Sequence, residues 1–243
     1  MRFLAFIWPT LAVLNRRIFP GLRLSVLPVL AALGIWMVGR LYSGTIGTSA
    51  SAIIGFVLME LLALCFCYAW FAIRWHRLLL LNEPQTALGG NFPPRAWRRY
   101  ALRLFAIAAV LTLFSGAVKV ISGNIWTLGI TGEWIRYILL YLFLGWLFHR
   151  LSPALASVPL GEPLTRGEAW RATRGANLPI LGLSAGTLAI STLLAFPMTP
   201  QGSEITAFEP LYIVAAFWVQ VLVFTTSITV VYRETVMRAD LRQ

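Results

Sequence analysis

The sequence has few charged residues and almost no aspartate. Charged side chains make up 12% of the 243 residues, and Asp240 is the single aspartate. A soluble domain carries about a quarter charged residues, whereas hydrophobic residues reach 58% here. This composition excludes a water-soluble globular protein and an intrinsically disordered chain.

Residues that usually carry catalysis or cross-linking are also scarce. The two cysteines, Cys65 and Cys67, are separated by one residue in an apolar run, which excludes a disulfide framework. Lys119 is the single lysine and lies outside any GxxxxGK[ST] phosphate loop, and no HExxH or GxSxG motif occurs. We therefore expect no cofactor, no metal site and no enzymatic activity.

Long apolar stretches dominate the rest of the chain. A helix that crosses a bilayer needs about 20 predominantly apolar residues. Six stretches approach or exceed that length: Leu24–Leu41, Ala52–Ile73, Leu104–Ile121, Trp134–Phe148, Leu178–Met198 and Pro210–Tyr232. The sequence therefore predicts an all-α polytopic protein with six transmembrane helices in a single integral membrane domain, residues 1–243.

The basic residues are distributed asymmetrically along this plan. The connections after the first, third and fifth stretches are nearly free of arginine, while both termini and the other two connections hold 17 of the 20 basic residues. The positive-inside rule then places both termini in the cytoplasm. We assign the protein to a bacterial inner membrane. Because the charges flank apolar stretches and fit no nucleic-acid module, the net charge of +11 does not indicate nucleic-acid binding.

Three cytoplasmic segments have the composition of interfacial amphipathic helices. Residues Phe3–Leu14 are too short to span a membrane, and Thr165-x-x-Glu168 has the form of a capping box that opens one helix. Arginine binds phosphate and tryptophan prefers the headgroup region. The candidate headgroup contacts are Arg95, Trp97, Arg98, Arg99, Arg166, Trp170, Arg171 and Arg174. General anchoring of the protein and specific recognition of anionic lipid are both compatible with this pattern.

A short motif recurs along the chain. The pairs His76-Arg77 and His149-Arg150 each end an apolar stretch, and Ala-Trp-Arg follows both after the same interval. The recurrence predicts three parallel repeat units, 1–77, 78–150 and 151–243, although chance is the alternative. We expect the four motif residues to anchor the protein at the interface; an intramembrane lipid enzyme would instead require both histidines to meet in one polar pocket.

Three polar residues fall inside the apolar stretches. Glu60 lies deep in the second stretch, Lys119 lies in the outer part of the third, and Gln220 lies in the sixth at a comparable depth. An ionisable group inside a span requires a partner or a function. One hypothesis is a polar path for protons or a small solute; the alternative is a buried polar contact that fixes helix packing. The Gly182-x-x-x-Gly186 motif is interpreted as a site of packing within the chain rather than as a dimer contact.

Three segments resemble a known group of proteins. Residues 71–77 (FAIRWHR), continued by Leu81-Asn82-Glu83-Pro84, together with residues 164–175 (LTRGEAWRATRG) and 228–234 (ITVVYRE), resemble YciC-like bacterial inner-membrane proteins and the membrane domain of some glycerophosphodiester phosphodiesterases. The resemblance implies a multi-span membrane module without assigned catalysis.

The sequence supports two functional hypotheses. The first is a non-enzymatic accessory or organising protein that binds anionic membrane lipid or a membrane-protein partner. The second is a carrier for protons or for a small or lipid-like solute, centred on Glu60.

Overall fold

The computed structural model describes residues 2–43, 50–84, 94–123, 129–161, 163–195 and 209–238. These residues form helices and contain no strand, so the predicted all-α class is confirmed. The long helices are α1 (Ile7–Ser43), α2 (Ala50–Leu80), α3 (Pro94–Gly123), α4 (Gly129–Leu151), α7 (Asn177–Ala195) and α8 (Glu209–Tyr232). Six candidate spans are long and apolar enough to cross a membrane, which confirms the predicted number.

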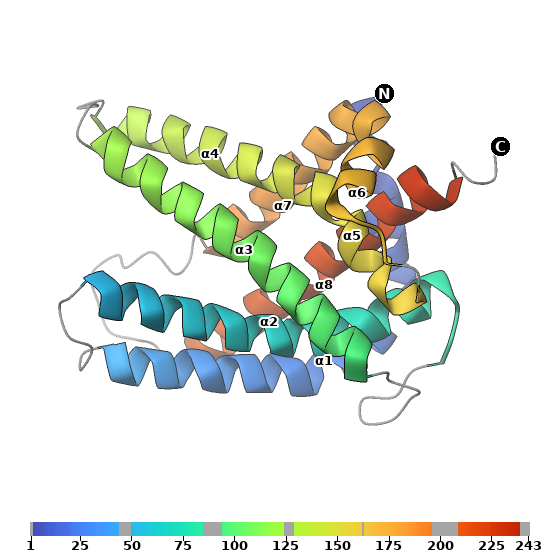
Figure 1. Ribbon diagram of the computed structural model, residues 1–243, viewed down its shortest axis with the longest axis horizontal. Coiled ribbons are helices and arrows are strands. Elements are labelled where there is room, and N and C mark those ends of the chain that lie inside the picture. The colour runs from blue at the N-terminus through green and yellow to red at the C-terminus, as the bar shows by residue number, and fades with distance from the viewer. Residues whose placement is uncertain are drawn as a thin grey trace.

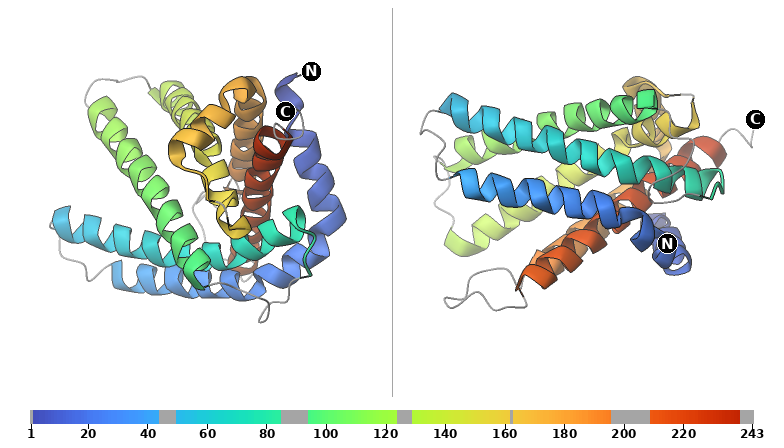
Figure 2. Two further views of the ribbon diagram at one scale, coloured as in Figure 1. Left: turned by 45° about the vertical axis from the view of Figure 1, so that its right-hand side comes forward. Right: turned by 90° about the horizontal axis from the view of Figure 1, so that it is seen from below.

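Six short elements complete the described chain. They are η1 (Arg2–Leu4), α5 (Pro153–Ala156), η2 (Val158–Leu160), α6 (Arg166–Ala172), η3 (Arg174–Ala176) and the π-helical η5 (Arg233–Met237). These elements, which include the first and last described ones (η1 and η5), gather at one end of the bundle together with the first turns of α3 (Figure 1). We call this the basic end. The α1–α2, α3–α4 and α7–α8 hairpins approach one another there and spread apart at the opposite end (Figures 1 and 2).

Helix α8 is the central helix of the bundle. In its apolar segment 67% of the residues are buried, against 11% in that of α2. The other helices surround α8 and leave apolar side chains such as Met59, Val110 and Leu139 exposed. In a membrane protein such side chains face lipid or another membrane protein.

The N-terminal segment folds back onto the bundle. At Arg17 the backbone of α1 leaves helical geometry (φ −124°, ψ 18°), three residues before Pro20. Proline has no N–H for the helix ladder and its ring collides with the preceding turn, which accounts for the kink. The predicted interfacial segment Phe3–Leu14 therefore corresponds to η1 and the first part of α1, which exposes Trp8 but buries Phe6.

The glycine motif of α7 receives this segment. A Cβ atom added at Gly182 would overlap the backbone carbonyl oxygen of Phe3, and one at Gly186 would touch Ile7. The buried ring of Phe6 packs beside the same helix, in a cluster with Ile180. The GxxxG motif is thus a site of packing within the chain, as predicted.

The two arginine–tryptophan segments differ in structure. We expected a separate interfacial segment around residues 95–103, but these residues form the first turns of α3, which continues without a break to Gly123. Residues Arg166–Ala172 do form a separate helix, α6, with the predicted capping box: the Thr165 hydroxyl accepts the N–H of Glu168, and the Glu168 carboxylate accepts the N–H of Thr165.

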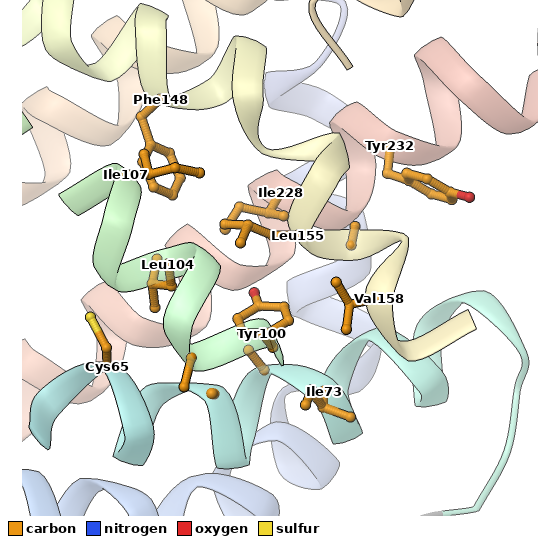
Figure 3. Close-up of a cluster of buried hydrophobic side chains, with 14 residues drawn as sticks. Cys65, Ile73, Tyr100, Leu104, Ile107, Phe148, Leu155, Val158, Ile228 and Tyr232 are labelled. Carbon is orange, nitrogen blue, oxygen red and sulfur yellow. The ribbon is translucent and has the colours of Figure 1, made fainter. Parts of the chain in front are cut away.

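A buried connector, residues 152–160, fills the bundle at the basic end. It comprises α5 and η2, and every residue from Ser152 to Pro159 is buried. Its Leu155 and Val158 pack with Tyr100 of α3 and Ile228 of α8 in the largest apolar cluster (Figure 3). The connector thus joins α4 to α6 through the interior of the protein rather than over its surface.

Candidate functional site

Six of the eight predicted headgroup contacts are exposed arginines at the basic end. Three lie in the first turns of α3, two in α6 and one in η3: Arg95, Arg98, Arg99, Arg166, Arg171 and Arg174. The exposure of all six agrees with the predicted surface, while lipid binding itself stays a prediction.

The two tryptophans of this surface hold its helices in place. The Nε1–H of Trp97 donates to the carbonyl oxygen of Phe66 at 3.0 Å, which ties the start of α3 to α2. Trp170 is 37% exposed and lies 3.7 Å beneath the guanidinium of Arg150. Each ring is therefore partly used for packing within the protein, and Trp170 keeps an exposed edge.

Arg103 links the two basic segments. Its Nη1 donates to the carbonyl oxygens of Ala154 and Leu164 at 2.8 and 2.9 Å. Leu164 directly precedes the N-cap of α6, so this side chain of α3 fixes the position of α6. Arg99 of α3 and Arg166 of α6 both lie close enough to Arg103 to interact with it electrostatically, so the positive charges of the two segments come together around this residue.

The predicted interfacial anchors Arg77 and Arg150 both donate hydrogen bonds within the protein. Arg77 donates to both carboxylate oxygens of Glu83 at 2.8 and 2.9 Å and to the carbonyl oxygen of Pro159 at 2.8 Å. Arg150 is 4% exposed and donates to Asn177 at 3.0 Å and to the Trp170 carbonyl at 2.9 Å. The interfacial assignment was wrong for Arg150, because the oxygens of Asn177 and Trp170 offer it buried acceptors. Arg77 stays partly exposed beside Glu83, and its interfacial role stays a prediction.

The predicted interfacial histidines are also buried. His76 and His149 have no exposed surface, and both contact hydroxyl groups of α8. His76 contacts Thr229 Oγ1 at 2.8 Å and the Tyr100 hydroxyl at 3.0 Å. Anchoring at a lipid surface is therefore wrong for these two residues, which connect α2 and α4 to the central helix.

One arrangement of protons satisfies both ring nitrogens of His76. The hydroxyl of Thr229 donates its proton to the Thr225 carbonyl at 2.9 Å, so its oxygen is free to accept from His76 Nδ1. The unprotonated Nε2 then accepts from the Tyr100 hydroxyl. In this arrangement the ring is neutral and both of its nitrogens have partners.

His149 occupies a similar polar site between α4, α7 and α8. Its Nδ1 lies 2.8 Å from the carbonyl oxygen of Gly145 and 3.2 Å from the hydroxyl of Ser184, and its Nε2 lies 2.9 Å from the hydroxyl of Ser227. The two histidines have separate partners, and no carboxylate is among them. The geometry does not assemble the shared acidic pocket that a two-histidine enzyme requires.

Of the predicted intramembrane polar trio, the structure describes the side chains of Glu60 and Gln220. Gln220 of α8 lines the central cavity. Glu60 is half-buried on α2, one turn from the cavity-lining Leu64 and on the same helix face. Lys119 belongs to α3, but its side chain lies outside the described residues, so the Glu60–Lys119 pair stays a hypothesis.

The central cavity was not predicted from the sequence. It has a volume of about 510 Å³ and lies between α1, α2, α3, α7 and α8, with Phe148 of α4 at its inner end. The free cysteines Cys65 and Cys67 both face it. No group of three or more His, Cys, Asp or Glu residues that could hold a metal occurs within the described part of the chain.

Comparisons with protein-family models, with curated proteins and with solved structures find no match. The resemblance to YciC-like proteins therefore stays a prediction, and the functional argument depends on the geometry given above.

Proposed function

We propose that this chain is a non-enzymatic protein of the bacterial inner membrane that binds anionic lipid headgroups at its basic end, as an accessory or organising component. The six apolar spans support a multi-pass membrane protein. The cytoplasmic location of the basic end is part of the proposal, supported by the positive-inside rule.

The observation that carries the proposal is that some arginines of the basic end bind within the protein while others remain exposed. Arg77, Arg103 and Arg150 are engaged in contacts within the protein. The six arginines of the headgroup surface remain exposed on α3, α6 and η3. A guanidinium group binds phosphate through two parallel hydrogen bonds, and each one near an anionic leaflet contributes about 1 kcal/mol.

Contacts within the protein hold the helices that carry these arginines in fixed positions, which favours specific binding of a headgroup over non-specific electrostatic attraction. Trp97 fixes the start of α3 on α2, Arg103 joins α3 to the segment before α6, and Arg150 fixes α6 from below. A preorganised set of donors loses less conformational entropy when it binds a headgroup than flexible side chains do. A membrane-protein partner with an acidic surface is the other class of ligand that such a surface accepts.

The test is lipid selection by the purified protein. The protein is reconstituted in nanodiscs of mixed phosphatidylglycerol and phosphatidylcholine. Native mass spectrometry then counts the lipids that stay bound to the protein after it is released from the nanodisc. We expect enrichment of phosphatidylglycerol, and a loss of about fivefold in affinity for each contacting arginine that is changed to glutamine, the equivalent of about 1 kcal/mol.

Two triple variants, R95Q/R98Q/R99Q and R166Q/R171Q/R174Q, sample the two halves of the surface. The matching arginine-to-lysine triples keep the charge but lose the paired donors, so they separate phosphate recognition from general anchoring. Equal lipid selection by the wild type and both glutamine triples would contradict the proposal.

The carrier hypothesis keeps one supporting observation, which is the central cavity with Gln220 in its wall. Its proton-path form requires Glu60, and an E60Q variant that retains full proton uptake in reconstituted vesicles would exclude that form.

A further inference from the structure

The central cavity is too large to be an ordinary packing defect. Its volume of about 510 Å³ lies within the range of about 300–1,000 Å³ that is typical of ligand pockets. Along α3 the lining extends from Leu104 to Thr112, eight residues and therefore about 12 Å. The cavity is partly open at the surface of the bundle rather than fully enclosed, so a ligand from the surrounding membrane can enter it.

The inner end of the cavity is closed by aromatic rings. Phe148 and Phe224 lie with their ring centroids 4.6 Å apart, and Phe71 adds a third ring to the lining. The ring of His149 lies 5.9 Å from that of Phe224, on the side of the polar contacts between α4 and α8. The aromatic floor and the buried connector thus separate the cavity from the basic end.

Polar side chains appear toward the other end of the cavity. Thr112 lies two turns beyond Leu104 on α3, Ser191 lies about two turns beyond Ser184 on α7, and Gln220 lies one turn beyond Phe224 on α8. Glu60 extends this trend on α2, one turn beyond Leu64 in the same direction. The far end therefore offers hydrogen-bonding groups among apolar neighbours such as Phe217, whereas Thr187 and the Tyr68 hydroxyl, nearer the floor, already have hydrogen-bond partners within the protein.

This distribution of polar groups selects the class of ligand. Water requires two to four polar partners, which the aromatic and aliphatic inner part does not provide, so a hydrated path is disfavoured. An alkyl chain matches the inner wall, and a hydrogen-bonding head matches Thr112, Ser191 and Gln220. None of the described lining residues is charged, so a charged head would be buried without a partner and an uncharged head is favoured.

We propose that the cavity binds a membrane amphiphile, with its alkyl chain on the aromatic floor and a small uncharged hydrogen-bonding head, as in a monoacylglycerol, at the far end. This site is separate from the arginine surface: it recognises the chain and a neutral head, whereas the arginines recognise phosphate. The site would bind the lipid-like ligand that the carrier hypothesis requires. The proposal concerns binding and does not depend on whether the protein transports that ligand.

Photolabelling tests the site directly. The probe is a monoacylglycerol with a diazirine near the end of its chain, added to the protein in phosphatidylcholine nanodiscs, and labelled peptides are mapped by mass spectrometry. We expect labels on the floor residues Phe148 and Phe224. Labels confined to residues on the outer surface, such as Val110 and Leu139, would overturn the proposal.

A pair of variants on one helix gives the matched control. A108W places an indole in the cavity wall and should reduce floor labelling at least fivefold. V110W places the same side chain on the outer face of α3, where Val110 is 61% exposed, and should leave floor labelling unchanged. Equal floor labelling in the two variants would contradict the proposal.

A competition experiment keeps the test independent of the folding of A108W. Excess unlabelled monoacylglycerol should abolish floor labelling in the wild type, and the same excess of phosphatidylglycerol should not; failure of the first competitor would refute a specific site. The arginine triples should label like the wild type, so failure of headgroup binding and failure of the cavity site are distinguishable.

Discussion

The docking of the N-terminal segment on α7 makes the sharpest prediction about stability. A Cβ atom added at Gly182 would lie 3.0 Å from the carbonyl carbon of Phe3 and closer still to its oxygen. Backbone atoms cannot rotate away as a flexible side chain does, so η1 would have to move by about 1 Å or more to restore normal contacts. We expect G182A to destabilise the protein by about 1–3 kcal/mol, the usual cost of overpacking.

Gly186 provides the control on the same helix. Its added Cβ would lie 3.4 Å from Ile7 Cδ1, which is an ordinary contact with a flexible side chain. G186A should therefore gain about 0.5–1 kcal/mol, because alanine favours helices over glycine. The two substitutions add the same methyl group one turn apart and are expected to have opposite signs.

The assay combines thermal unfolding in detergent with limited trypsin digestion. Arg16 and Arg17 are exposed at the kink of α1, between the docked segment and the rest of the helix. If η1 leaves α7, cleavage at these arginines should accelerate in G182A and not in G186A. Equal melting temperatures and equal cleavage rates in the two variants would refute the reasoning.

Three further predictions concern the basic end. R150L should destabilise the protein by about 2–4 kcal/mol in denaturation assays, because it strands the buried acceptors around α6, whereas R174L at an exposed position should change stability by less than about 0.5 kcal/mol. H149A should also destabilise the protein, while H149Q retains one donor and one acceptor and should lose less; equal losses would show that packing alone matters. Hydrogen bonds from the backbone and hydroxyl of Thr165 hold the pKa of Glu168 in the folded protein below its usual value of 4.5. The ionised Glu168 therefore stabilises the folded protein fully above pH 4.5. This stabilisation is lost as the pH falls through the lower pKa of the folded state. The difference in melting temperature between the wild type and E168Q should therefore be present at pH 7 and vanish in acid, and a pH-independent difference would contradict the capping assignment.

Local sequence signals predicted the elements but not the directions of the side chains. The six spans follow from composition over about 20 residues, and the capping box of α6 needs only Thr165 and Glu168, three residues apart. The glycine motif was interpreted correctly, although its partner Phe3 could not be identified. In each case the determining pattern lies within one element.

The histidines and Arg150 were misassigned because their partners are distant in sequence. His76 contacts Thr229 across 153 residues, and Arg150 donates to the side chain of Asn177 across 27. A basic or titratable residue at the end of an apolar stretch has the same local pattern whether it faces a headgroup or a buried oxygen. The tertiary structure alone decides between the two.

The buried connector shows a second limit of the sequence. Its prolines, Pro153 and Pro159, and its serines are typical of a surface turn, and its apolar residues are too few to indicate a span. Ser157 satisfies the backbone N–H of Leu164 at 2.9 Å, and Arg77 and Arg103 satisfy carbonyl oxygens of the segment. These contacts allow an irregular segment to be buried, and they come from helices that a local pattern cannot bring together.

The proposed role at the basic end is tested most directly by the association of spin-labelled lipids with the reconstituted wild-type protein. We predict that labelled phosphatidylglycerol associates more strongly than labelled phosphatidylcholine, and that the preference declines as the salt concentration rises, because exposed charges are screened. Equal association of the two lipids at low salt would contradict the account.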